Sequence, residues 1–415
     1  MALILLIIAH YGVNFVYSDE WIMAPVFQHI DSGIVSYHDF WQMFSYHRLF
    51  FGKILITLSA YLTHWNTKVE MLLSFGFCLI TLLFIYLMIR RSIRNKGLIF
   101  LSMFIATYWL FSPVLSENWL WGWEVIWFMG TAGAIASIYF LSRKRLNVAI
   151  ISGVFSTYSF GWGQSVWPIG LLMMIIQRRK RKPILTWSGA GILTLGAYYF
   201  HFSVTGNTPP PPVLAFLHHP LNAALYYLVI FGRPFTNDLY PAMTFGAVSL
   251  LILIPVLGVV WEKRKDIDKY LAWLGMILLS LIGALMIIMG RLNHDYQATT
   301  PLTDALQSRY TAVSILYIIG LSGLIISLLD SLKLNKKLLK YAVVTILVIQ
   351  IPLLYSSYWI GINTSRDRYV LMKRLQSCSN QVLTKDCLSS NDYLNTNQVA
   401  KEQLQYLKDK HWAGY

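Results

Sequence analysis

Long apolar runs alternate with short polar connections along most of the chain. A straight membrane-crossing helix needs about 20 predominantly apolar residues, and many of these runs approach that length. The pattern therefore predicts an all-α polytopic membrane protein with about eleven transmembrane helices. The predicted crossings are 2–17, 69–89, 97–113, 123–142, 147–160, 165–177, 184–203, 241–261, 270–289, 310–330 and 340–360.

Composition agrees with this pattern, since hydrophobic residues make up 56% of the 415 residues and charged residues only 13%. Such a chain is too apolar for a soluble globular protein. We expect one transmembrane domain over residues 1–360. A small tail of polar character follows over residues 361–415.

Most lysines and arginines fall into five short clusters between apolar runs. These clusters lie at 90–96, 143–145, 178–182, 263–269 and 333–340. Two predicted crossings separate each cluster from the next, so all five can be cytoplasmic, as the positive-inside rule requires. The clusters thus account for the net charge of +15 without nucleic acid as a partner. The same rule predicts a cytoplasmic N-terminus and an extracytoplasmic tail.

Two further apolar segments occupy 49–65 and 221–231. If either crossed the membrane, the basic clusters that follow it would lie outside the cytoplasm. We therefore expect helices that lie in the outer interface, or re-entrant segments. The first of them belongs to an outer loop of about fifty residues that follows the first crossing.

Candidate chemistry gathers on the predicted outer side. Asp19 and Glu20 follow the first apolar run directly, and a carboxylate at a membrane boundary is costly enough to suggest a function. Isolated arginines on the same side are typical of ligand contacts, because a guanidinium gives paired, charge-assisted hydrogen bonds. The cytoplasmic loops are short and contain no nucleotide-binding glycine-rich loop. A lipid-linked donor is therefore expected in place of a nucleotide-activated one.

The chain resembles the GT-C glycosyltransferases, multi-span enzymes that use polyprenyl-phosphate-linked sugars on the outer face of the membrane. The resemblance rests on Asp19 and Glu20 after the first crossing and on the long first outer loop. Two features differ from many members: there is no W-W-D motif, and the tail is small. Size and plan are similar to those of small bacterial and phage-borne glucosyltransferases that modify O-antigen. The resemblance implies a bacterial inner membrane protein with its active site facing the periplasm.

The chemistry that this resemblance implies assigns roles to twelve residues. Asp19 is expected to be the general base, with Glu20 orienting the acceptor or a water molecule. The expected contacts to the donor phosphate are Arg291, Arg309, Arg48 and His47. The expected contacts to the sugar or acceptor are Trp21, Trp121, Glu124, Trp162, Gln164 and Tyr310.

Other interpretations remain open at this stage. The acids also fit a helix end in the headgroup zone, and the tryptophans fit an interfacial belt. A divalent cation, Mg²⁺ or Mn²⁺, is possible if Asp19, Glu20 and Asp295 converge. The alternative functions are a lipid or polysaccharide translocase or transporter, and an O-antigen polymerase or ligase. A translocase needs a continuous polar path, which the predicted crossings do not display.

Overall fold

The structure is a computed structural model that describes residues 1–201, 219–291, 302–332, 335–380 and 398–415. Within these ranges the chain is helical, without a β-strand. The first half contains α1 (Ala2–Tyr11), η1 (Ser18–Ile22), α2 (Met23–Asp31), α3 (Tyr37–Trp41), α4 (Phe50–Thr63), α5 (Thr67–Ser92), α6 (Lys96–Leu110), α7 (Ser116–Trp119), η2 (Gly122–Glu124), α8 (Val125–Ser142), α9 (Leu146–Ser159), η3 (Gly161–Ser165), α10 (Val166–Ile176) and α11 (Arg181–Tyr199). The second half contains α13 (Pro220–Gly232), η4 (Arg233–Phe235), α14 (Leu239–Glu262), η5 (Arg264–Asp266), α15 (Ile267–Arg291), η6 (Thr303–Leu306), η7 (Ser308–Tyr310), α16 (Thr311–Ser331), α17 (Lys336–Asn380) and α20 (Gln398–Asp409).

Each of the eleven predicted apolar segments overlaps a helix, so the all-α prediction is confirmed for the described residues. Among the described residues, six helices are long and apolar enough to cross a membrane. These candidates are Thr67–Ser92, Gly122–Ser142, Leu239–Glu262, Arg264–Arg291, Ser308–Ser331 and Lys337–Cys378. The remaining predicted crossings form shorter helices, and α1 has only ten residues.

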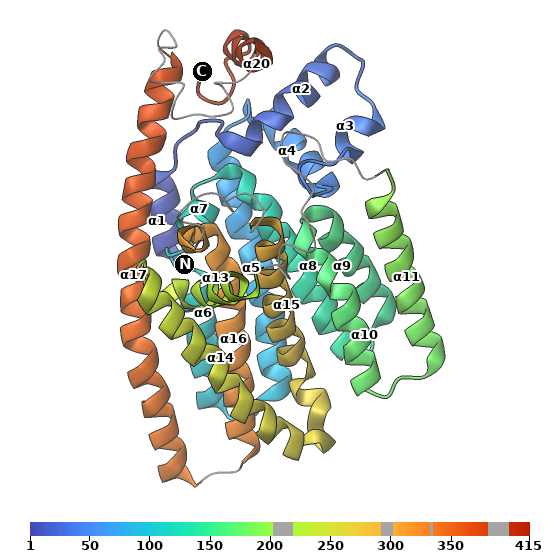
Figure 1. The fold of residues 1–415 in the computed structure, drawn as a ribbon, viewed down its shortest axis with the longest axis vertical. Helices are drawn as coiled ribbons and strands as arrows, with labels where there is room; N and C mark the ends of the chain where they lie inside the picture. The colour runs from blue at the N-terminus through green and yellow to red at the C-terminus, as the bar shows by residue number, and fades with distance from the viewer. Residues whose placement is uncertain (202–218, 292–301, 333–334, 381–397) are drawn as a thin grey trace.

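Basic clusters from distant parts of the sequence meet at one end of the helix bundle, the lower end in Figure 1. Arg91 donates a hydrogen bond to Ser142 Oγ at 2.9 Å, which joins the first cluster to the second. Lys144 Nζ lies 3.8 Å from Asp268 Oδ2, beside the fourth cluster. The carboxylate of Asp330 accepts hydrogen bonds from the backbone between α5 and α6. This arrangement has the charge distribution that the positive-inside rule describes.

The opposite end of the bundle is covered by α2, α3, α4 and α20 (Figure 1). Helix α4 corresponds to the predicted interfacial segment 49–65, and α13 corresponds to the segment 221–231. Figure 1 shows α13 lying across the long helices instead of along them. Trp412, close behind α20, packs its ring 5.5 Å from Phe27 of α2 and 5.1 Å from Tyr61 of α4. The end of the chain is thereby attached to the segment that carries α2 and α4.

Helix α1 ends at Tyr11, well before the predicted residue 17. The backbone after it is extended, and Phe15 N–H donates to Thr67 Oγ1 at 3.2 Å. Asn14 Oδ1 in turn accepts a hydrogen bond from Thr67 N–H at the start of α5. The apolar residues after Tyr11 therefore bury their side chains as an extended segment tied to α5, which hydropathy alone does not distinguish from a helix.

The boundary predicted at residue 360 falls inside α17, which continues to Asn380 (orange in Figure 1). The sequence after Gly361 contains no further glycine or proline before Asn380, so nothing in it interrupts the helix. Met372 and Leu375 pack against Val13 and Phe15 of the first extended segment. The part of α17 beyond residue 360 therefore packs against the start of the chain.

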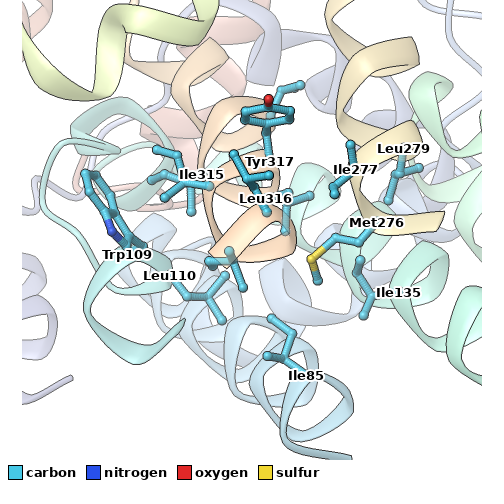
Figure 2. Close-up of a cluster of buried hydrophobic side chains, with 14 of the residues drawn as sticks. Ile85, Trp109, Leu110, Ile135, Met276, Ile277, Leu279, Ile315, Leu316 and Tyr317 are labelled. Carbon is cyan, nitrogen blue, oxygen red and sulfur yellow. The ribbon is translucent and has the colours of Figure 1, made fainter. Parts of the chain in front are cut away.

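A hydrophobic core surrounds α16 at the centre of the bundle. Figure 2 shows Leu316 and Tyr317 of α16 among side chains from α5, α6, α8 and α15. At the edge of this core, the indole of Trp109 donates to Gln350 Oε1 of α17 at 2.8 Å. Apolar side chains thus fill the interior, and a buried polar group at its edge is hydrogen bonded.

Helices α15 and α16 approach each other where Gly323 faces Trp273. A Cβ atom on Gly323 would lie 2.5 Å from Trp273 Cζ3, closer than real contacts allow. The indole of Trp273 is held by a hydrogen bond to Ser92 Oγ at 2.9 Å, so the ring cannot move freely. We predict that Gly323→Leu lowers the free energy of unfolding by about 2 kcal/mol, as overpacking does.

Thermal unfolding of the purified protein in detergent measures this loss. The matched control is Gly258→Leu on α14, because nothing lies within 4 Å of a Cβ atom at Gly258. An equal loss in both variants would contradict the close packing described here.

Candidate functional site

A cavity of about 280 Å³ lies beneath the covered end of the bundle. Its walls come from seven parts of the chain. They are Asp19, residues 44–49, residues 121–127, residues 160–164, Tyr199, the end of α15 at 283–291, and η7 with the start of α16 at 309–313. Loops and helix ends thus supply most of the lining, as is common for functional sites.

Nine of the twelve predicted site residues line this cavity. They are Asp19, His47, Trp121, Glu124, Trp162, Gln164, Arg291, Arg309 and Tyr310. Their assigned roles stay predictions. Glu20, Trp21 and Arg48 do not line the cavity.

Asp19 lies in the short turn η1 that follows the extended segment. Ser18 adopts a left-handed conformation with φ 52°, and its hydroxyl donates to Asp19 Oδ1 at 3.3 Å. Burial raises the pKa of Asp19 above its ordinary value of 3.8, whereas Arg309 and Arg291 lower it. A carboxylate in this setting is a stronger base than one in water.

Arg291 and Arg309 both contact the ring of Tyr310. Their guanidinium carbons lie 5.8 Å and 5.3 Å from the ring centre. Arg291 is exposed and forms no ion pair with any carboxylate in the described ranges. Arg309 Nε is buried and likewise has no hydrogen-bond partner among the described residues. Two cations at one aromatic ring with unused donors form a wall suited to an anionic group.

Glu117 lies behind this wall and was not predicted as a site residue. Its carboxylate is 4.0 Å from Arg309 Nη1 and 3.8 Å from Arg368 Nη1. Burial alone would raise the pKa of Glu117, but the two arginines hold it below the ordinary value of 4.5. Arg368 belongs to α17, in the part of the chain assigned to the tail. No sequence signal connects a residue so far along the chain to the segment between α6 and α8.

Aromatic side chains form a second wall. Phe160 lies 4.6 Å from Trp127 and 5.0 Å from the imidazole of His47, and Trp127 lies 5.7 Å from Trp162. Trp127 and Phe160 were not predicted, because each sits inside or beside an apolar run and looks like an ordinary core residue. Burial lowers the pKa of His47 to about 4. This wall is therefore uncharged at neutral pH.

Two polar groups complete the lining. Glu124 accepts a hydrogen bond from Asn118 Nδ2 at 2.7 Å. Gln164 Oε1 accepts one from the hydroxyl of Tyr199 at 2.7 Å. Carboxylate, amide and hydroxyl groups on an aromatic surface are the kind of lining that binds neutral polar ligands.

Glu20 and Trp21 serve the packing of the loops, in contrast to the roles predicted for them. Glu20 accepts hydrogen bonds from the backbone N–H groups of Tyr17 and Trp123, each at 2.8 Å. Both oxygens are thus engaged in tying η1 to the segment that leads into α8. Trp21 is fully buried in a hydrophobic cluster with Phe27 and Trp65. Adjacent residues point to different surroundings, so only Asp19 of the acidic pair reaches the cavity.

Arg48 is buried and points away from the cavity. Its guanidinium donates to the backbone carbonyls of Trp41, Tyr198 and Phe200. These acceptors use all three nitrogens of the side chain, leaving no donor nitrogen without a partner. The prediction of a phosphate contact at Arg48 is therefore not supported by its position.

The described residues contain no group of three or more His, Cys, Asp or Glu side chains placed to hold a metal ion. Asp19 and Glu20 do not converge, and Asp295 lies outside the described residues. A divalent cation thus stays a prediction without a ligand set.

No family model, no curated protein and no solved structure matches the chain. The resemblance to the GT-C enzymes therefore rests on the sequence features alone.

The buried position of Glu20 makes stability depend on pH. Burial raises the pKa of Glu20 above its ordinary value of 4.5, although hydrogen bonds from Tyr17 and Trp123 and the charge of Arg368 oppose the shift. The folded protein therefore holds a proton that the unfolded chain releases as pH rises through 4.5. We predict that the melting temperature falls on the order of a few degrees between pH 5 and pH 8, and that Glu20→Gln makes this fall shallower.

Thermal unfolding across this pH range tests the prediction, with the exposed Glu262→Gln as control. The same pH dependence in all three proteins would contradict the assignment to Glu20.

Proposed function

We propose that this protein is a membrane glycosyltransferase. It transfers a sugar from a polyprenyl-phosphate donor to a glycan or lipid acceptor of the cell envelope. The observation that carries the proposal is that Asp19, Arg291 and Arg309 line one cavity. The reaction needs a base near a cationic wall, and the cavity combines the two.

The transfer is a displacement at the anomeric carbon. The acceptor hydroxyl forms the new C–O bond and gives its proton to the Asp19 carboxylate. The bond between the anomeric carbon and the phosphate oxygen breaks, and polyprenyl phosphate leaves with the bonding electron pair. Arg309 and Arg291 stabilise the negative charge that develops on this phosphate. Burial of Asp19 favours proton uptake during this step, since it raises the pKa of the carboxyl group.

The size and lining of the cavity support a single sugar as the transferred group. Its volume of about 280 Å³ is near the lower end of the range for small-molecule pockets, about 300 Å³. Trp127, Trp162 and Phe160 offer aromatic faces on which the C–H surface of a sugar can stack. A polyprenyl chain is far larger than this volume, so it has to extend out of the cavity into the bilayer.

The orientation follows from the separation of charge along the bundle. Basic clusters gather at the end opposite the loops that cover the cavity (Figure 1). With this basic end in the cytoplasm, the cavity faces the extracytoplasmic side. The proposal accordingly includes about eleven crossings, a cytoplasmic N-terminus and an extracytoplasmic C-terminus. The membrane is a bacterial inner membrane, where polyprenyl-phosphate sugars are available on the periplasmic side.

The proton acceptor gives the first test. Asp19→Asn keeps the shape of the side chain but removes the base, so sugar transfer should fall by about 100-fold or more. Extracted lipids and surface glycans, read by mass in cells with and without the gene, identify the product. Transfer is then measured in purified variants with matched membrane levels.

The matched control is Asp238→Asn, an exposed aspartate outside the cavity. Full transfer by Asp19→Asn would exclude the proposed base. Movement of the lipid-linked glycan across the membrane without any added sugar would favour a translocase. Altered lengths of the surface glycan chains would favour a polymerase.

The phosphate contact gives the second test. Arg309→Met removes the charge but keeps an unbranched apolar side chain, so the affinity for polyprenyl phosphate should fall about tenfold. Native mass spectrometry of the detergent-solubilised protein with polyprenyl phosphate measures this loss. Arg264→Met, an exposed substitution at the basic end, should bind like the wild type. Equal weakening in both variants would indicate a general headgroup effect and contradict the site.

A further inference from the structure

Arg368 connects the last long helix to both charged parts of the cavity wall. It lies on α17, and only 9% of its side chain is exposed. The residue does not line the cavity itself. A buried arginine needs several partners, and here they come from two separate loops.

One set of contacts reaches the arginine wall through Glu117. Glu117 Oε2 accepts hydrogen bonds from Arg309 N–H at 3.1 Å and from Ser308 Oγ at 3.0 Å. Glu117 N–H donates in return to Ser308 Oγ at 3.0 Å. These bonds fix the carboxylate at the start of the turn that carries Arg309. Its other oxygen then lies between the guanidinium groups of Arg309 and Arg368.

A second set of contacts reaches the loop that carries the acid. The guanidinium of Arg368 lies 5.4 Å from the ring centre of Tyr17 and 5.6 Å from that of Trp121. Trp121 Nε1 donates to the carbonyl of Tyr17 at 3.2 Å. Arg368 Nε also donates to the carbonyl of Leu120 at 3.3 Å. Tyr17 is two residues from Asp19, so these contacts hold the backbone that presents the carboxylate.

We propose that Arg368 and Glu117 are positioning residues that set the geometry and the charge balance between Asp19 and Arg309. This inference rests on the proposed function. The Glu117 carboxylate pairs with both Arg368 and Arg309. It therefore does not fully neutralise Arg309, which lines the cavity. The same guanidinium packs on the aromatic pair behind the acid. Helix α17 thereby links the loop that carries Asp19 to the turn that carries Arg309. Neither Arg368 nor Glu117 lines the cavity itself.

The charges predict opposite effects for the two positioning residues. Arg309, Arg291, Ser18 and the neighbouring Glu20 act on Asp19, and Glu124, a second buried carboxyl group, lines the same cavity. Arg368→Met leaves Glu117 paired with Arg309 alone, which weakens the field of Arg309 at Asp19 and should make Asp19 harder to ionise. The acidic limb of the pH profile of kcat/KM then moves up by roughly half a unit. Loss of the negative charge in Glu117→Gln should move the same limb down by a similar amount. Damage to packing alone has no reason to give shifts of opposite sign.

Three further variants complete the experiment. Arg368→Lys keeps the charge and should retain the wild-type limb, even if weaker stacking on Tyr17 and Trp121 lowers kcat. The double variant Arg368→Met with Glu117→Gln should return the limb towards the wild-type position. Arg366→Met, an exposed substitution on the same helix, is the matched control and should leave the profile unchanged.

The outcomes separate this inference from the proposed function. A wild-type protein that transfers no sugar overturns the proposed function and this inference with it. If the wild type is active, the two charge variants should shift the limb in opposite directions while Arg366→Met does not. Shifts in the same direction, or no shift relative to Arg366→Met, overturn the inference and leave the glycosyltransferase proposal standing.

Discussion

A buried charge needs polar partners, and the loops that cover the cavity follow this requirement closely. Glu20 is bound by two backbone N–H groups, and Arg48 is bound by three backbone carbonyls. Lys53, also buried, donates to the carbonyls of Asp39 and Gln42. Each of these ionisable groups is hydrogen bonded within the covering layer. Asp19, Arg291 and Arg309 differ from them, because they line the cavity.

The ionisable groups thus divide into those that hold the covering loops in place and those that line the cavity. The long helices supply an apolar core around α16, in which the indole of Trp273 is hydrogen bonded to Ser92 Oγ. The loops at one end contain the satisfied charges, which hold the loops in place. The cavity between core and loops then presents a carboxylate, two guanidinium groups and an uncharged aromatic wall. A preorganised set of opposite charges in a partly dry site is the usual basis of electrostatic catalysis.

The sequence predicted the helices well, because apolar runs of this length have few other structures available. It predicted less about which charges face the cavity. Asp19 and Glu20 look equivalent in the sequence, and their difference arises from the turn at Ser18 and the backbone donors at Tyr17 and Trp123. Arg48 looks like an isolated outer cation, yet its partners are carbonyls, which carry no side-chain signal. Arg368 was assigned to a tail because the apolar run ends near residue 360, whereas the helix does not.

The central claim is that a phosphate and a sugar occupy one cavity between Asp19 and Arg309. The most direct measurement is an experimental structure in lipid with a non-hydrolysable hexosyl polyprenyl phosphate bound. The account predicts the phosphate against Arg309 and Arg291, the sugar on the aromatic wall, and Asp19 facing the anomeric carbon. A ligand bound instead among the basic clusters at the opposite end of the bundle would contradict it.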